Sequence, residues 1–356
     1  MKIGIVGLPG CGKTTLFNLL TETFEAPDFG HAPGKPRIKS VKVRDPRLER
    51  LRDDYQPKKY TPAAVEIHDF PALSGGEEDR AGLADLLAPA REMDALILVV
   101  RGFPNPALPG GESPDPVRDL EDVRGELILT DLAIAERRIE KLAEKSRKPS
   151  FTEEDRKERV LLERVKGDLE SEKFASLEGL SPDDAKRLTG FCFLSAKPSI
   201  TVLSGETAEV PAERLRELEG MSGNEVFPAA VRNELEILQL PEEERAPFLE
   251  EYGIRDFLRD PMIGGAYRAA GRIPFFTAGD KEVRAWTIRA GSTAPQAAGA
   301  IHSDFERGFI RAEVVSYDDY VACGGVKGAK EKGRYRLEGR EYVVREADII
   351  EFRFSV

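Results

Sequence analysis

The sequence has few of the features that build metal clusters, disulfide frameworks or membrane spans. Its three cysteines, Cys11, Cys192 and Cys323, are scattered over 356 residues without metal-type spacing. No run approaches the roughly 18 apolar residues of a membrane helix. The first residues enter an apolar stretch at once, which leaves no room for a signal peptide. We therefore expect no membrane association and a reduced, cytoplasmic setting.

Positive charge is also in deficit. The chain has 53 Lys and Arg against 64 Asp and Glu, a formal net charge of −11. A general attraction to nucleic acid is therefore not expected, and any RNA contact must come from a local basic face. With 40% hydrophobic and 33% charged residues, the composition is that of a soluble globular protein, and the length predicts two or three domains.

What the sequence does have is a glycine-rich segment close to its start. The pattern G-x-x-x-x-G-K-[ST] runs from Gly7 to Thr14, after a short β-branched run and before an apolar helical pattern. Strand, glycine loop and helix together are typical of a phosphate-binding P-loop. The alternative is a glycine-rich turn between strand and helix that binds nothing.

The residue types fit phosphate chemistry. Glycines let backbone N–H groups wrap a phosphate chain, and the helix N-terminus adds partial positive charge. Lys13 is expected to reach the β- and γ-phosphates, and the Thr14 hydroxyl to coordinate Mg²⁺. The predicted nucleotide-binding residues here are Gly7, Gly10, Cys11, Gly12, Lys13, Thr14 and Thr15.

A second metal ligand is predicted at Asp69. Ala63–Asp69 looks like a strand ending in an acid, and it follows a Pro- and Gly-rich loop at Glu25–Pro36. In P-loop GTPases that loop is switch I, and the acid after it holds Mg²⁺, here through water. The alternative is an ordinary cap or turn aspartate. His68 is expected to face the other side of the strand, so we do not assign it a catalytic role.

Alternating strands and helices indicate a parallel α/β sheet. Arg37–Val43 predicts an exposed or edge strand, and Ala95–Val100 a fully buried one. Phe191–Leu203 also predicts a buried strand, and Val226–Leu238 a helix. A P-loop nucleotide-binding domain is therefore expected over residues 1–118 and 190–274.

Two further regions interrupt or follow this domain. Leu120–Ala143 and Thr152–Lys173 are charged amphipathic patterns joined by a short turn, which predicts an antiparallel helical hairpin inserted at 119–189. Its charges suit either a solvated surface or a lever that meets a partner. Residues 275–356 contain short strands, including Glu341–Val344, and one helix, which predicts a small ubiquitin-like β-grasp domain.

The C-terminal region contains one basic run. The residues Lys327, Lys330, Lys332, Arg334, Tyr335 and Arg336 lie within ten positions and are interrupted by glycines. We interpret the run as a loop between strands, either solvated or following an RNA backbone, with Tyr335 stacking on an unpaired base.

The chain resembles the YchF (EngD, Obg-like) ATPases over nearly its whole length. The resemblance rests on Gly-Leu-Pro-Gly-Cys-Gly-Lys-Thr-Thr-Leu-Phe-Asn at 7–18, Asp-Pro-Arg-Leu at 45–48, Phe-Leu-Ser-Ala-Lys-Pro at 193–198 and long C-terminal motifs at 275–288 and 301–314. It implies a G domain with an inserted coiled-coil hairpin, a C-terminal TGS domain, hydrolysis of ATP in preference to GTP, and association with ribosomes.

The sequence departs from that family at its switches and base reader. The family P-loop usually has Asn where this chain has Gly10, and the metal-binding Thr of switch I falls near Pro33. The glycine of switch II is Ala72. The family's Asn-x-x-Glu base motif is Leu203-Ser204-Gly205-Glu206, so Leu203 and Ser204 are the predicted base contacts.

Two functions are compatible with these residues. The first is a slow Mg²⁺-dependent P-loop nucleoside triphosphatase that acts on ATP, with GTP as an alternative substrate, and associates with ribosomes or RNA. The second is a nucleotide-gated ribosome- or RNA-binding protein with little or no hydrolysis, which the altered switches favour. Turnover of the pure protein separates them.

Overall fold

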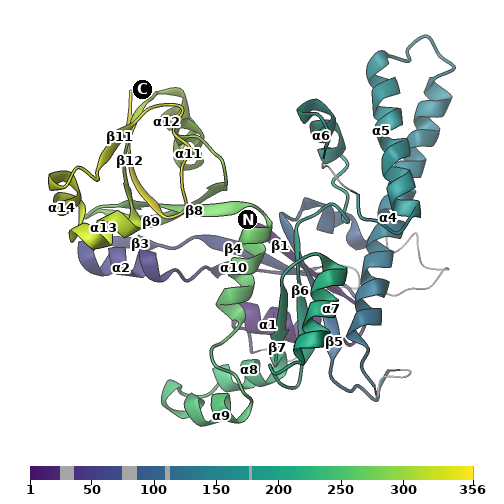
Figure 1. The fold of residues 1–356 in the computed structure, drawn as a ribbon, viewed down its shortest axis with the longest axis horizontal. Coiled ribbons are helices and arrows are strands. Elements are labelled where there is room, and N and C mark those ends of the chain that lie inside the picture. The colour runs from purple at the N-terminus through teal and green to yellow at the C-terminus, as the bar shows by residue number, and fades with distance from the viewer. Residues whose placement is uncertain (25–35, 74–85, 109–112, 176–178, 356) are drawn as a thin grey trace. The chain divides into compact units, whose positions relative to one another are not determined.

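A computed structural model of the chain describes residues 1–24, 36–73, 86–108, 113–175 and 179–355. These residues form two compact units. The nucleotide unit contains residues 2–39 and 66–266. The C-terminal unit contains Met1, residues 40–65 and residues 267–356. Two six-stranded sheets organise the fold (Figure 1).

The sheet of the nucleotide unit has the strand order β2-β4-β1-β5-β6-β7. Every pairing from β4 to β7 is parallel, as the alternation of strands and helices predicts. The strand β2 lies at one edge, which confirms the edge-strand prediction. The strands are β1 Lys2–Gly7, β2 Arg37–Lys42, β4 Ala64–Asp69, β5 Ala95–Gly102, β6 Ser199–Gly205 and β7 Val226–Ala229.

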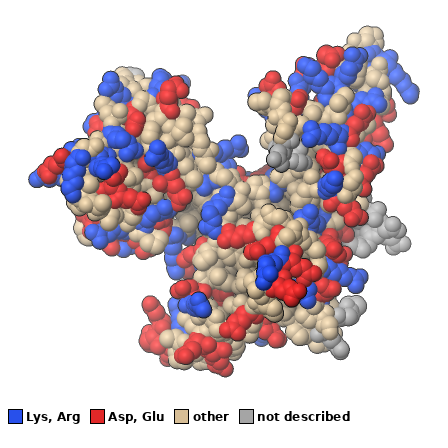
Figure 2. Space-filling model, viewed as in Figure 1, with Lys and Arg blue, Asp and Glu red and all other residues tan. Residues whose placement is uncertain are grey.

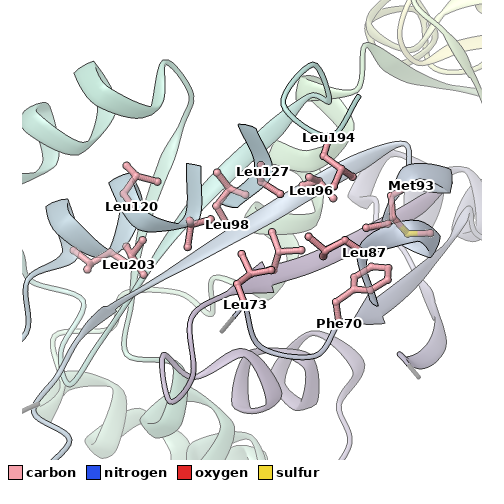
Figure 3. Close-up of a cluster of buried hydrophobic side chains, with 14 of the residues drawn as sticks. Phe70, Leu73, Leu87, Met93, Leu96, Leu98, Leu120, Leu127, Leu194 and Leu203 are labelled. Atoms are coloured by element: carbon pink, nitrogen blue, oxygen red, sulfur yellow. The ribbon is translucent and has the colours of Figure 1, made fainter. Parts of the chain in front are cut away.

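Helices pack against this sheet. The helix α1 (Lys13–Thr21) contacts β1 and α8 (Val231–Leu238). Between β5 and α4, leucines from strands and helices form one buried cluster, which Figure 3 shows around Leu96, Leu98 and Leu127. The remaining helices are η2 Ala88–Glu92, α6 Pro182–Thr189, α7 Ala212–Ser222, η3 Glu242–Glu244, α9 Arg245–Glu251 and α10 Arg259–Ala269.

The predicted helical hairpin is present. It consists of α4 (Pro116–Lys145) and α5 (Glu153–Glu170), which lie side by side (Figure 1). Leu142 and Leu162 belong to the buried seam between them. A capping box at Thr152 starts the second helix, where it satisfies backbone N–H groups that would otherwise lack acceptors.

Asp131 of α4 ties the foot of the hairpin to the rest of the unit. Its buried carboxylate accepts from the backbone N–H groups of Leu194 at 2.9 Å and Ser195 at 2.7 Å. It also pairs with Arg91 of η2 at 2.8 Å. The segment around residue 194 is therefore held by a side chain rather than by a sheet. For this reason the predicted strand Phe191–Leu203 was wrong in its first half, and β6 begins only at Ser199.

Two other element predictions in this region need correction or confirmation. The predicted helix Val226–Leu238 is a strand, β7, followed by the helix α8. A short apolar run fits the periodicity of a helix and that of a strand equally well. Here the run pairs with β6, so it forms a strand. The glycine-rich sequence of residues 260–271 predicts helix and loop, and α10 is present there.

The C-terminal unit has the strand order β11-β10-β12-β8-β9-β3. The first and last of its five C-terminal strands, β8 and β12, are parallel neighbours, which is the β-grasp arrangement predicted for residues 275–356. The strand expected at Glu341–Val344 is only a single bridge, between Thr293 and Val343. The strands are β8 Arg272–Ala278, β9 Glu282–Arg289, β10 Phe309–Ser316, β11 Arg336–Glu338 and β12 Asp348–Phe354, and the helices are α11 Ala294–Ile301, α12 Ser303–Arg307, α13 Tyr317–Cys323 and α14 Val326–Glu331.

The sixth strand of this sheet comes from the N-terminal third of the chain. β3 (Lys59–Thr61) pairs in parallel with β9, and Leu48 and Leu51 of α2 (Pro46–Tyr55) are fully buried in a cluster with residues of β8 and β9. Residues 40–65 therefore belong to the C-terminal unit. The expectation that residues 1–118 lie wholly in the nucleotide-binding domain is corrected on this point, because hydrophobic burial and strand pairing place this stretch elsewhere.

Charged side chains of both signs cover the visible face of the molecule (Figure 2). Acidic side chains gather over η3 and α9, where Glu242, Glu243 and Glu244 are exposed. Among the described residues, no helix is both long enough and apolar enough to cross a membrane.

Candidate nucleotide-binding site

The glycine-rich segment forms the expected strand, loop and helix. It leaves β1 at Gly7 and enters α1 at Lys13. Gly10 and Gly12 have φ angles of +68° and +98°, in the left-handed region that favours glycine. The loop therefore takes a shape that side chains at these positions would oppose. Its end is the N-terminus of α1, where free N–H groups and the helix dipole favour an anion.

Lys13 lies folded back over this loop. Its Nζ donates to the carbonyl oxygens of Gly7 and Leu8, both at 2.9 Å, and the side chain is buried. The ammonium group is thus held at the mouth of the loop. Cys11 lies beside it with 1% of its surface exposed, and burial raises the pKa of its thiol while Lys13 opposes the rise. We expect this cysteine to be a packing residue of the loop rather than a nucleophile.

Thr14 and Asp69 meet at the same place. Thr14 Oγ1 donates to Asp69 Oδ2 at 3.2 Å, although 55 positions separate the two residues. Asp69 is the last residue of β4 and is 7% exposed. Burial raises the pKa of its carboxyl, and the charge of Lys13 and the Thr14 hydrogen bond oppose that rise. The structure thus brings the two predicted metal ligands together.

The chemistry of this pair fits a magnesium ion. Asp69 Oδ1 is buried and has no hydrogen-bond partner among the described residues, so this carboxylate oxygen can still accept from a ligand or coordinate a metal. Mg²⁺ prefers oxygen ligands and commonly takes only one or two from the protein, with the rest from water and phosphate. Among the described residues, no group of three or more His, Cys, Asp or Glu side chains is placed to hold a metal alone.

Further residues converge on the loop because the parallel strands all end at one edge of the sheet. Gly102 of β5 is in register with Gly205 of β6. The chain leaving β5 then passes the loop: Asn105 Nδ2 lies 3.5 Å from the Gly10 carbonyl oxygen. A Cβ atom at Gly12 would lie 2.9 Å from Ser204 Oγ and 3.7 Å from the Phe103 ring.

Comparison with known proteins agrees with this geometry. A family model for 50S ribosome-binding GTPases matches residues 2–152, and a model named YchF-GTPase_C, described as a protein of unknown function, matches residues 273–355. The chain is 39% identical to the ribosome-binding ATPase YchF of Bacillus subtilis over 100% of both chains. It is 36% identical to Obg-like ATPase 1 of Oryza sativa subsp. indica, over 100% of this chain and 92% of that protein.

A solved structure agrees as well. The YchF GTPase of Schizosaccharomyces pombe aligns with a TM-score of 0.78 at 27% identity, over 99% of this chain and 97% of that one. The chain belongs to the YchF and Obg-like ATPase family. Its P-loop domain, inserted hairpin and C-terminal YchF domain are those of the family, which confirms the predicted fold class and resemblance.

Within this YchF-family fold, the two predicted base contacts, Ser204 and Leu203, have different surroundings. Ser204 is buried beside Gly12, at the edge where a nucleotide base is expected. Leu203 is 3% exposed and packs in the leucine cluster of Figure 3. Its side chain is therefore a core side chain, which corrects its prediction as a base contact. The segment that follows β6 also contacts α8, because Asn233 donates to the Glu206 carbonyl oxygen at 2.7 Å.

The first half of the predicted basic loop is a helix. Val326–Glu331 forms α14, with Lys327 and Lys330 exposed, so the loop prediction was wrong there, while residues 332–335 form the connection from α14 to β11. Tyr335 also differs from the prediction. Its hydroxyl donates to Glu313 at 3.0 Å, and the ammonium group of Lys330 lies 4.4 Å from its ring centroid. One ring face is thus occupied, and Tyr335 is not placed for stacking on a base there.

Phe103 and Asn105, which lie against the loop, are not predicted by any motif of the sequence. Their only sequence signal is their position just after a buried parallel strand, whose end meets the P-loop edge. Pro33 and Ser74–Gly76, which carry part of the switch predictions, lie outside the described residues. Ala72, at the position of the switch II glycine, is described and half-buried.

Proposed function

We propose that this chain is a slow nucleoside triphosphatase that binds ATP together with Mg²⁺ and associates with ribosomes. The observation that carries the proposal is the hydrogen bond between Thr14 Oγ1 and Asp69 at the end of the P-loop, where the second, buried carboxylate oxygen has no partner in the part of the chain that the structure describes. Relatives of 36–39% identity over the whole chain are named as ATPases, which supports the assignment of this chemistry.

Each group has a role in binding the triphosphate. The backbone N–H groups of Gly10 to Thr15 surround the phosphates, and Lys13 Nζ exchanges its two carbonyl acceptors for phosphate oxygens. Thr14 and Asp69 are the proposed protein ligands of the Mg²⁺ ion. When bound, Mg²⁺ neutralises charge on the β- and γ-phosphate oxygens. These groups act by positioning and by electrostatics, which are the main sources of catalysis in phosphoryl transfer.

A second function stays open: nucleotide-gated binding with little hydrolysis. Two observations favour it. Residues 24–39 contain no Ser or Thr to offer a switch I hydroxyl to the metal, and residue 72 is Ala rather than Gly. Both changes concern sensing of the γ-phosphate and leave the phosphate-binding loop intact.

The base preference follows from what surrounds Ser204. An Asp that pairs with the guanine N1–H and N2–H₂ gives strong guanine selectivity, because another base leaves it unpaired. Here the segment after β6 is Ser204, Gly205 and Glu206, with the Glu206 side chain exposed. We therefore propose that ATP binds at least as well as GTP.

Titration of the full chain with MgATP and MgGTP tests this proposal. We expect ATP to bind with an affinity equal to or greater than that of GTP, and Lys13→Ala to weaken both. Circular dichroism of the variant checks that the fold is intact. A GTP preference of tenfold or more, about 1.4 kcal/mol, would overturn the proposed base preference. Absence of binding to either nucleotide would overturn the proposed function.

Ribosome association rests on the family. The relative from Bacillus subtilis is named a ribosome-binding ATPase, and the family model over residues 2–152 is described as a 50S ribosome-binding GTPase. For this acidic chain, the basic residues of and after α14 are the proposed contact: Lys327, Lys330, Lys332 and Arg334.

A further inference from the structure

Arg37 packs on α1, the helix whose first turn carries Thr14, and its position in the sequence predicts no role for it. It is the first residue of β2, and its guanidinium carbon lies 4.9 Å from the centroid of the Phe17 ring. Phe17 follows Thr14 by three residues on α1, so the two side chains lie on adjoining turns of one helix face. The guanidinium of Arg37 therefore packs on the turn of α1 that follows the Thr14 hydroxyl.

The guanidinium has an unused donor. Arg37 Nη1 is buried and has no hydrogen-bond partner among the described residues. Its charge reaches Asp69, where it opposes the effect of burial on the pKa of that carboxyl. Asp69 Oδ1 is likewise buried without a hydrogen-bond partner in the described part of the chain. A charged donor and a charged acceptor thus lie against neighbouring turns of α1, Asp69 at Thr14 and Arg37 at Phe17. Such groups are costly to bury unless a ligand satisfies them.

The expected ligand is an anionic oxygen. If Asp69 and Thr14 hold a metal ion, the positive charge of Arg37 faces a second cation, and an anion must lie close to both. In a bound triphosphate the γ-phosphate lies on the metal side and carries that charge. A diphosphate lacks this group. Residues 24–39 also offer no hydroxyl to the metal, so recognition of the γ-phosphate has to rest on another group.

We propose that Arg37 donates its buried Nη1 group to the terminal phosphate of the bound nucleotide and makes the site selective for triphosphate over diphosphate. The assignment rests on the proposed nucleotide binding. It gives Phe17 a second role, because its ring fixes the guanidinium by a cation–π contact. Charge that develops on the same phosphate oxygens during hydrolysis is stabilised by the same donor.

A purely structural role for Arg37 predicts a different pattern. Its stem and guanidinium then only cover Phe17, and loss of the contact lowers the stability of the fold and weakens all nucleotides alike. The affinity ratio of ATP to ADP therefore separates the two roles, and it does not depend on turnover.

The experiment is calorimetric titration of the full chain with MgATP and MgADP. It compares the wild type, Arg37→Gln, Arg37→Lys and Lys42→Gln. Lys42 is exposed on the same strand, and Lys42→Gln removes one positive charge as Arg37→Gln does, so it is the matched control. We expect Arg37→Gln to weaken ATP by roughly 10- to 100-fold, the usual worth of a hydrogen bond to a charged group, and to leave ADP nearly unchanged.

The two further variants sharpen the result. Arg37→Lys keeps the charge but not the planar fork, so ATP should weaken by less than in Arg37→Gln and still by more than ADP. Lys42→Gln should change neither nucleotide. Equal weakening of ATP and ADP by Arg37→Gln, or no weakening, would overturn the assignment while leaving the proposed nucleotide binding in place. Absence of nucleotide binding by the wild type would overturn both.

Discussion

At the residue scale, the chemistry of this chain lies in groups that the fold leaves unsatisfied. Within the described ranges, Asp69 Oδ1 and Arg37 Nη1 have no hydrogen-bond partner, and Lys13 donates to the carbonyl oxygens of its own loop. The sequence predicted Lys13, Thr14 and Asp69 because their residue types and spacing carry a mechanism. It could not predict Arg37, because the sequence of an edge strand does not show where the arginine side chain points or that it contacts Phe17.

Glu234 is another unsatisfied residue, outside the nucleotide site. It lies on α8 with no exposed surface, and its Oε2 accepts from the Leu258 N–H at 2.8 Å. Its Oε1 has no hydrogen-bond partner among the residues that the structure describes. Burial raises the pKa of this carboxyl to about 7, and the Leu258 hydrogen bond opposes the rise. The folded protein therefore keeps a proton that the unfolded chain loses near pH 4.5.

This difference sets a pH dependence of stability. Between about pH 4.5 and 7 the unfolded chain ionises Glu234 while the folded chain does not, so stability falls as pH rises, by about 3 kcal/mol in total. Above pH 7 the loss stays constant. The variant Glu234→Gln should lack this fall, because its side chain is neutral at every pH. Urea denaturation at pH 5 and pH 8 measures it, and an equal pH dependence in both proteins would contradict the account.

At the scale of elements, the wrong predictions have identifiable physical causes. The glycines around residue 328 suggested a loop, yet a Cβ at Gly328 would lie 2.0 Å from the Cys323 carbonyl oxygen. The glycine is needed for close packing of α14 on α13 rather than for a turn. Likewise the first half of Phe191–Leu203 bonds to Asp131, a partner 60 positions or more away that no local pattern reveals.

The helix α14 carries the testable prediction at the scale of elements. Figure 2 shows lysine and arginine side chains at this corner of the C-terminal unit. Replacement of Lys327, Lys330 and Lys332 by Ala should reduce co-sedimentation with ribosomes, most strongly at low salt, because phosphate contacts by Lys depend on counterion release. Nucleotide affinity should not change.

A triple variant of the hairpin tip, Lys141→Ala, Arg147→Ala and Lys148→Ala, is the matched control, since it removes the same charge from other exposed positions. If the hairpin variant lost co-sedimentation and the α14 variant kept it, the contact would belong to the hairpin.

At the scale of the whole molecule, the sequence predicted the class of each domain but not which residues build it. The β-grasp sheet takes β3 from residues 59–61, and α2 covers it with Leu48 and Leu51. Pairing over more than 200 positions depends on tertiary burial, and a short strand such as Lys-Tyr-Thr carries too little local signal. The position of the nucleotide site was predictable, because the carboxyl ends of neighbouring parallel strands lie at the same edge of a sheet.

The central claim is that the P-loop, Thr14 and Asp69 form a site that hydrolyses a nucleoside triphosphate with Mg²⁺. Its most direct test is the steady-state release of phosphate from ATP by the full chain, measured with Mg²⁺, with a chelator, and for Lys13→Ala. We predict slow release by the wild type that requires Mg²⁺ and exceeds that of Lys13→Ala. A wild-type rate indistinguishable from that of Lys13→Ala, or unchanged by the chelator, would contradict the claim.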